Sequence, residues 1–194
     1  MSIEQPLLVI LAGGQSSRMG IGDKATMTLG GRRMIDLLVD RFRPSAGTIA
    51  VSGATDRETG LPIIDDDPGG PKGPAGALWS VNSWLNADHP SVDAFFTVPV
   101  DAPFLPPDLL DVLSANGPTS IAADETGLHP TVGYWQVTAL AAAFSQLQNV
   151  PSIPLHRLAS LCSATPVSLD ATQLMNINTQ DDLRKANAML DDQS

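Results

Sequence analysis

The chain has 194 residues, of which 43% are hydrophobic and 16% are charged, a composition typical of a folded globular protein. The 11 Lys and Arg residues against 21 Asp and Glu residues give a formal net charge of −10, which argues against broad binding to nucleic acid phosphates. This length favours one domain, and we expect a single domain over residues 1–194. The only cysteine, Cys162, excludes a disulfide within the chain and a metal cluster built on cysteines.

The apolar run near the start of the chain, Leu7–Ala12, is too short to span a membrane. No Lys or Arg precedes it, so it lacks the basic region of an export signal. A buried strand is the better interpretation. We therefore expect a cytoplasmic protein without a membrane partner, and a single cysteine fits a reducing compartment.

Short apolar runs alternate along the chain with longer segments of helical spacing. The runs, which we predict to be strands, are Leu7–Ala12, Thr48–Ser52, Pro62–Asp65, Ala94–Val98, Ser120–Ala123, Thr131–Gln136 and Pro166–Leu169. The predicted helices are Met34–Phe42, Ala75–Asn86, Pro107–Ala115, Thr138–Leu147, Ser152–Leu161 and Thr179–Leu190. Continuous apolar strands that alternate with helices predict a mostly parallel sheet covered on both faces. The expected fold class is α/β, with three α/β/α layers and ligands at one edge of the sheet.

A glycine-rich loop follows the first predicted strand directly. It reads LAGGQSSRMGIGDK from Leu11 to Lys24, and it carries the cations Arg18 and Lys24 in an otherwise acidic chain. Glycines let backbone N–H groups approach an anion, and the cations add charge for phosphates. The loop lacks the Gly-Lys-Ser/Thr of a Walker A motif and the spacing of a dinucleotide fingerprint. It therefore predicts a phosphate-binding loop of another kind, whereas Arg32 and Arg33 further along are interpreted as solvated surface charges.

An aspartate stands at the end of the fourth predicted strand. Asp101 follows the apolar run Ala94–Val100, so its carboxylate is expected at the same sheet edge as the glycine loop. Mg²⁺ prefers oxygen ligands and is commonly held by one or two carboxylates together with substrate phosphates. Asp101 is therefore predicted to be a metal ligand rather than a turn or cap residue.

Four segments, taken together, are similar to the motifs of a known family. In chain order they are the loop Leu11–Lys24, PVDAPFLPPDLL at Pro99–Leu110, HPTVGYW at His129–Trp135 and MNINTQDDL at Met175–Leu183. They resemble the molybdenum cofactor guanylyltransferases, the MobA family, among the nucleotidyltransferases with a Rossmann-like fold. The resemblance implies transfer of GMP from GTP to the terminal phosphate of the molybdenum–molybdopterin cofactor. It also implies the release of pyrophosphate and a dependence on Mg²⁺.

The resemblance further implies roles for individual residues. The expected catalytic residues are Lys24, Arg18 and Asp101, with Asp101 also as the metal ligand. The expected nucleotide contacts are Leu11, Ala12, Gly13, Gly14, Lys24, Ser52, Asp65, Asp66 and Asp101. The expected acceptor contacts are Gly73, His129, Asn176 and Asn178. Thr179, next to Asn178, is expected to cap the last helix.

Two positions depart from the family pattern. Gly73–Ala77 reads GPAGA where the family usually has GPLAG, and Ser52 stands where the family usually has Asn. In the acidic segment Asp65–Asp67, Asp65 and Asp66 are both candidates for the nucleotide contact. At least one of the three carboxylates is expected to belong to a solvated turn.

Other functions stay open from the sequence alone. A cytidylyltransferase on the same cofactor and a sugar-phosphate nucleotidyltransferase are the nearest, although Gly13-Gly14 after Leu-Ala resembles the guanine-specific pattern. A nucleotide-binding accessory protein without turnover is an alternative of another class, which Lys24 and Asp101 disfavour. A dinucleotide-dependent oxidoreductase is disfavoured by the missing fingerprint. The expected partners are GTP, the molybdenum–molybdopterin cofactor and transient cofactor-delivery or molybdoenzyme proteins, with no nucleic acid.

Overall fold

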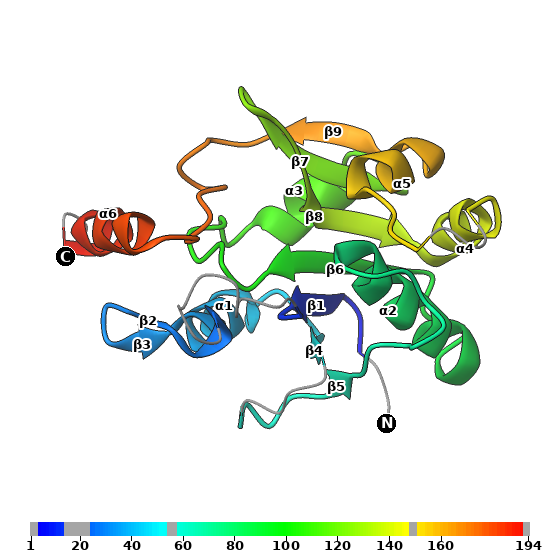
Figure 1. Cartoon of the computed structure of the whole chain (residues 1–194), viewed down its shortest axis with the longest axis horizontal. Helices are drawn as coiled ribbons and strands as arrows, with labels where there is room; N and C mark the ends of the chain where they lie inside the picture. The colour runs from blue at the N-terminus through cyan, green and yellow to red at the C-terminus, as the bar shows by residue number, and fades with distance from the viewer. Residues whose placement is uncertain (1–3, 14–23, 54–57, 148–150, 192–194) are drawn as a thin grey trace.

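The structure is a computed structural model of the chain, and it describes residues 4–13, 24–53, 58–147 and 151–191. A seven-stranded sheet forms its centre, in the order β5-β4-β1-β6-β8-β7-β9 (Figure 1). The strands are β1 (Leu7–Leu11), β4 (Thr48–Ser52), β5 (Ile63–Ile64), β6 (Ala94–Pro99), β7 (Ser120–Asp124), β8 (Gly127–Gln136) and β9 (Thr165–Ser168). Each apolar run that was predicted to be a strand overlaps one of these strands, which confirms the α/β class.

One strand of the sheet runs against all the others. β8 pairs antiparallel with β6 and β7, whereas the remaining pairs are parallel. The other six strands therefore end at the same edge of the sheet, and β8 begins there. The loops after β1, β4, β5 and β6 gather at this edge together with the β7–β8 turn, and we call it the carboxyl edge.

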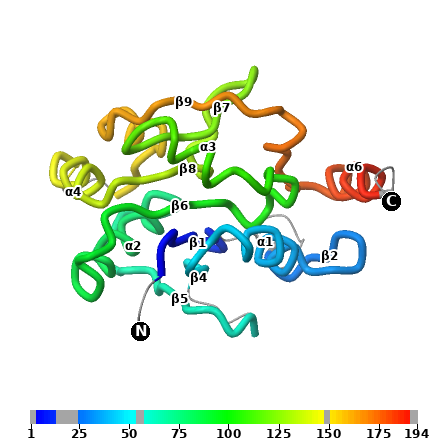
Figure 2. Tube along the Cα trace, turned by 180° about the vertical axis from the view of Figure 1, so that it is seen from behind, coloured from blue at the N-terminus to red at the C-terminus, as the bar shows by residue number. Residues whose placement is uncertain are grey.

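Helices cover both faces of the sheet, as predicted (Figures 1 and 2). One face carries α2 (Pro74–Asp88), α4 (Val137–Ser145) and α5 (Leu155–Leu161). The other carries α1 (Met34–Phe42) and α3 (Leu109–Ser114). Of the described helices, none combines the length and the apolar character that a membrane crossing requires.

Strand β1 shows why the buried strands read as unbroken apolar runs. Leu7, Val9 and Leu11 belong to the core beneath α2, α4 and α5. The alternate residues Leu8 and Ile10 belong to the core beneath α1 and α3. Because successive side chains of a strand point to opposite faces, a strand between two helical layers needs apolar residues at every position.

A small unit outside the main sheet had no counterpart among the predicted elements. A short 3-10 turn, η2 (Lys24–Thr26), leads into a hairpin of β2 (Thr28–Leu29) and β3 (Arg32–Arg33). The last helix, α6 (Gln180–Asp191), packs on this hairpin at the left of Figure 1. Their shared core, which we call the third core, includes Leu29, Met34, Ile177 and Ala186. The N–H of Gly30 also donates to Oδ1 of Asn187, 157 residues away in sequence, at 3.0 Å.

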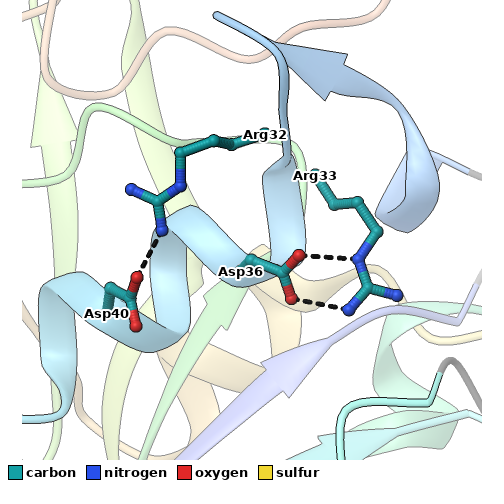
Figure 3. Close-up of polar contacts among 4 residues, drawn as sticks. All are labelled: Arg32, Arg33, Asp36 and Asp40. Carbon is teal, nitrogen blue, oxygen red and sulfur yellow. Dashed lines mark hydrogen bonds and ion pairs between the residues drawn. The ribbon is translucent and has the colours of Figure 1, made fainter.

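The two arginines of β3 form ion pairs with α1 (Figure 3). The Arg33 guanidinium donates to both carboxylate oxygens of Asp36, at 2.6 and 2.8 Å, and Arg32 pairs with Asp40. The Arg32 and Asp40 side chains are 51% and 60% exposed, so the contribution of their pair to stability is small. Arg32 is an exposed surface charge, as predicted, whereas Arg33 is partly buried in its pair with Asp36. Both arginines tie β3 to α1.

Helix α6 begins with a reciprocal cap that involves Thr179, as expected. Thr179 Oγ1 accepts a hydrogen bond from the N–H of Asp182 at 3.1 Å. In return, Asp182 Oδ2 accepts from the N–H groups of Thr179 at 2.8 Å and Asn178 at 3.0 Å. The cap satisfies N–H groups that the first helical turn leaves free. The Thr179 side chain, followed by the Asn178 backbone, lowers the pKa of Asp182.

Replacement of this cap is expected to destabilise the protein in a pH-dependent way. Asp182→Ala should lower Tm near neutral pH by about 2–4 °C, the usual effect of a lost cap in a chain of this size. Because the folded-state pKa is depressed, the contribution of the carboxylate is present above its unfolded pKa near 3.9 and is lost as the pH falls through the folded pKa. The gap in Tm between wild type and variant should therefore shrink below about pH 4 in circular dichroism melts.

Asp181→Ala is the matched control for this measurement. Asp181 is the neighbouring acidic residue of α6, and its side chain is 68% exposed in a surface pair with Arg184. Its removal should change Tm little at either pH. A gap for Asp182→Ala that is equally large at pH 7 and pH 3 would contradict the role of the ionised carboxylate.

Candidate functional site

Backbone hydrogen bonds keep the loops of the carboxyl edge in register beyond the strands. The N–H of Ala12 donates to the carbonyl oxygen of Ser52, and that of Gly53 to Ile64, both at 3.1 Å. On the other side of β1, the N–H of Val100 donates to the carbonyl oxygen of Leu11 at 3.1 Å. The segments that begin at Asp65, Gly53, Gly13 and Asp101 therefore follow one another along the edge, in the strand order β5-β4-β1-β6.

Two glycines meet where β1 and β4 end. Gly53 has a φ of +131°, and a Cβ at this position would lie 3.2 Å from the backbone nitrogen of Gly13. A larger residue would therefore be strained and would push the Gly13 loop away. Gly13 itself is exposed, whereas Leu11 and Ala12 are 8% and 7% exposed. Sequence reasoning missed Gly53, although a glycine directly after a buried strand is the signal that marks it.

Ser52, which was predicted to contact the nucleotide, is fully buried at the end of β4. Its Oγ has no hydrogen-bond partner in the described part of the chain. A buried hydroxyl without a partner is costly, so this oxygen is available for a further hydrogen bond. The role of Ser52 stays a prediction.

Asp101 lies directly beside the C-terminal asparagine pair. The N–H of Ile177 donates to the carbonyl oxygen of Asp101 at 2.8 Å. Ile177 is 1% exposed and belongs to the third core, whereas Asn176 and Asn178 on either side of it are only partly buried. The structure therefore places the backbone of Asp101 next to the Asn176–Asn178 segment, and the roles of these residues stay predictions.

The oxygen donors of this place fit a magnesium ion. Asp101 offers carboxylate oxygens, and Asn176 and Asn178 offer amide oxygens, which are the ligand types that Mg²⁺ prefers. Within residues 4–13, 24–53, 58–147 and 151–191, no three His, Cys, Asp or Glu side chains gather as a metal-binding group. Mg²⁺ is commonly held by one or two carboxylates together with substrate phosphates, so such a group of three is not required.

The three aspartates after β5 divide into one structural and two exposed residues. Asp67 Oδ1 accepts from the N–H of Gly69 at 2.8 Å, and Oδ2 accepts from Trp79 Nε1 at 3.0 Å. The Gly69 bond, followed by the Trp79 bond, lowers the pKa of Asp67. Asp67 is thus the turn residue that the sequence indicated, although it is hydrogen-bonded rather than merely solvated. Asp65 and Asp66 are exposed and remain the candidates for the nucleotide contact.

The permuted GPAGA segment keeps a glycine where the backbone requires one. A Cβ on Gly76, in the first turn of α2, would lie 2.0 Å from the carbonyl oxygen of Pro71. No side chain fits there without moving the Pro71–Gly73 loop. Gly73, the predicted acceptor contact, is exposed at the N-cap of α2 with a φ of +79°. The departure from the family pattern therefore preserves the close approach of loop and helix.

His129 lies inside β8, because this strand begins at Gly127 rather than at Thr131 as predicted. Nε2 of His129 is 3.0 Å from Oδ1 of Asp124, which ends β7. The hydroxyl of Thr126, followed by His129, lowers the pKa of Asp124 to about 2. Asp124 was not among the predicted site residues. The signal that could have found it is the sequence Asp-Glu-Thr-Gly, a turn pattern shortly before the HP motif.

Some predicted residues cannot be placed. Gly14 and Arg18 lie outside the described residues, and for Lys24 the structure describes the backbone alone, at the start of η2. Ala25, the next residue, is fully buried in the core beneath α1 and α3, to which Ala12, Val100 and Ala102 also belong. The roles of Arg18 and Lys24 stay predictions.

Comparison with known proteins gives the family. Residues 8–163 match the family model described as the MobA-like NTP transferase domain. A molybdenum cofactor guanylyltransferase of Cereibacter sphaeroides is 32% identical over 188 residues, which cover 94% of this chain and 95% of that protein.

Solved structures share the fold. A protein named molybdopterin-guanine dinucleotide biosynthesis protein A, from Archaeoglobus fulgidus, superposes with a TM-score of 0.69 at 20% identity, covering 96% of this chain and 99% of that one. The 4-diphosphocytidyl-2C-methyl-D-erythritol synthase of Anaerococcus prevotii superposes with a TM-score of 0.68 at 14% identity, covering 95% of each chain. Because the second protein is named for a cytidine compound, the shared fold does not determine which base is bound. The sequence match is what decides the family, and this chain belongs to the MobA-like NTP transferase family of nucleotidyltransferases.

Proposed function

We propose that this protein transfers GMP from GTP to the terminal phosphate of the molybdenum–molybdopterin cofactor and releases pyrophosphate. The observation that carries the proposal is the 2.8 Å hydrogen bond from Ile177 to Asp101, which joins the MNINT and PVDAP motifs at one edge. The similarity to a guanylyltransferase over nearly the whole chain supports guanine as the base and the cofactor as the acceptor.

The order of the strands supports a division of the edge into two halves. The nucleotide side consists of the residues that follow three neighbouring strands. Gly13 follows β1, Gly53 follows β4, and the Asp65–Asp66 pair follows β5. His129, on the acceptor side, lies near the start of β8, which is the neighbour of β6 on the side away from β1. Asp101 follows β6, between the two halves, where the α-phosphate of a bound GTP would meet the acceptor.

The reaction is an in-line displacement at phosphorus. An oxygen of the acceptor phosphate forms a bond to the α-phosphorus of GTP, and the bond from that phosphorus to the bridging oxygen of the β-phosphate breaks, so pyrophosphate leaves. A phosphate nucleophile is already ionised near neutral pH, so no general base is required. The main obstacle is repulsion between two anions. Backbone N–H groups of the Leu11–Gly14 segment, with Lys24 and Arg18, would hold the triphosphate and offset its charge.

Asp101, Asn176 and Asn178 are the residues that would hold a magnesium ion. When bound, such an ion supplies positive charge to phosphate oxygens and so lowers the barrier to their approach. Independently of the metal, the third core and the Thr179–Asp182 cap fix the backbone around Asn178. The chain's own contribution is therefore a rigid set of oxygen ligands at the junction of the two substrates.

The proposal is tested by pyrophosphate release with each nucleoside triphosphate, with and without the molybdenum–molybdopterin cofactor. We expect release with GTP only when the cofactor is present. A higher kcat/KM with CTP would instead indicate a cytidylyltransferase. Release with a sugar phosphate in place of the cofactor would indicate a sugar-phosphate enzyme. Binding of GTP without release under any condition would indicate an accessory protein.

Asp101→Asn is expected to lower kcat by roughly a thousandfold, because the loss of a metal ligand removes several kcal/mol of transition-state stabilisation. The KM for GTP should change far less, since the nucleotide contacts predicted after β1, β4 and β5 remain.

The matched control is Asp108→Asn. Asp108 is exposed at the N-cap of α3, and its side chain makes no capping hydrogen bond within the described residues. This variant should keep the wild-type rate. Circular dichroism verifies that both variants are folded, and a folded Asp101→Asn protein with the wild-type rate would remove the metal role of Asp101.

A further inference from the structure

The β7–β8 hairpin carries a polar pair that the proposed chemistry leaves unexplained. Asp124 at the end of β7 and His129 in β8 have side chains that are only 5% and 22% exposed. Nε2 of His129 is buried and makes no hydrogen bond of good direction within the described residues, yet it lies 3.0 Å from Asp124 Oδ1. The contact is therefore electrostatic, between a buried ring nitrogen and a carboxylate oxygen.

The carboxylate of Asp124 is held rigidly by its own turn. Oδ1 accepts from the N–H of Thr126 at 2.8 Å, from the Thr126 hydroxyl at 2.7 Å and from the N–H of Gly127 at 3.2 Å. These three bonds hold Asp124 Oδ1 in place without any contribution from His129. The position of this oxygen is therefore set by the turn.

An irregularity in β8 places this pair at the carboxyl edge. Pairing with β7 shifts from Ile121–Gly133 to Ala122–His129, so Pro130, Thr131 and Val132 form a bulge. Bulges next to functional sites redirect side chains. The turn of the hairpin projects from the sheet at the top of Figure 1. Because β8 runs antiparallel to β6, the start of β8 and the end of β6 belong to the same edge of the sheet.

We propose that Asp124 is a positioning residue for acceptor binding, which holds Nε2 of His129 so that Nδ1 donates to an anionic oxygen of the acceptor. This inference rests on the proposed function. A carboxylate on one ring nitrogen fixes the orientation of an imidazole and determines which nitrogen stays free for a ligand. Nε2 of His129 is buried, whereas the side chain as a whole is 22% exposed, so another part of it is open to a ligand.

A second turn of the same kind shows what Asp124 would do if it were only structural. Asp170 Oδ1 accepts from both the N–H and the hydroxyl of Thr172, each at 2.8 Å. This is the same Asp-x-Thr arrangement, on the exposed loop after β9, without a histidine against the carboxylate among the described residues. Asp170→Asn therefore measures the effect of the turn alone and serves as the matched control.

The experiment compares the steady-state kinetics of Asp124→Asn, Asp170→Asn and wild type with GTP and the molybdenum–molybdopterin cofactor. The asparagine keeps a carbonyl oxygen for Thr126 and Gly127 but removes the charge at His129. We expect the KM for the cofactor to rise roughly tenfold in Asp124→Asn, the size of a lost charge-assisted contact. The KM for GTP should stay unchanged, and Asp170→Asn should match wild type in all parameters.

A double-variant comparison separates positioning from stability. His129→Ala should raise the KM for the cofactor by a similar factor, and Asp124→Asn added to it should cause no further rise. If Asp124→Asn does not fold in a melting experiment, Asp124→Ser replaces it, because a serine hydroxyl also closes such turns without charge.

The outcomes distinguish this inference from the proposed function. A wild-type protein that releases no pyrophosphate with the cofactor overturns the function and the inference together. Wild-type turnover, combined with an unchanged cofactor KM in folded Asp124→Asn, overturns the role of Asp124 alone. A further rise on adding Asp124→Asn to His129→Ala does the same, because it shows that the two residues act separately.

Discussion

The hydrogen bond from the Ile177 N–H to the Asp101 carbonyl oxygen is the interaction on which the arrangement of the site depends. The Ile177 side chain is buried in the third core, so one residue binds the sheet edge through its backbone and the β2–β3 unit through its side chain. Asn176 and Asn178 are held on either side of this anchor. The Asp182 carboxylate holds the backbone from the other direction, so the segment that carries the asparagine pair is fixed at both ends.

The carboxyl edge of this acidic chain presents neutral backbone where β1 and β4 end. Gly13 and Gly53 approach one another there, and a Cβ on Gly53 would lie 3.2 Å from the Gly13 nitrogen. Asp67 and Asp124, two of the acidic groups near the edge, have oxygens already occupied by protein donors. These two carboxylates therefore act within the turns that they close, whereas the role proposed for Asp101 is metal binding.

Much of the fold and part of the site could be predicted because the pattern of apolar residues along the sequence reflects which positions are buried. β1 is apolar at every position since cores lie on both sides of it, and a sheet of such strands gathers its loops at one edge. The β2–β3 hairpin was missed because strands of two residues, one of them Arg32–Arg33, carry no periodic pattern. The start of β8 was placed too late because His129 and Pro130 interrupt its apolar run. Asp124 was missed because its role arises from a turn that brings it against His129, and sequence spacing alone does not show that contact.

The two outermost strands bear on how the protein behaves at high concentration. β5 has only two residues, and β9, at the opposite margin, contains Pro166, which has no N–H to donate. An incoming extended segment from another molecule would find few unpaired backbone groups at either margin. The sheet is thus protected against edge-to-edge aggregation by the short length of β5 at one margin and by Pro166 in β9 at the other.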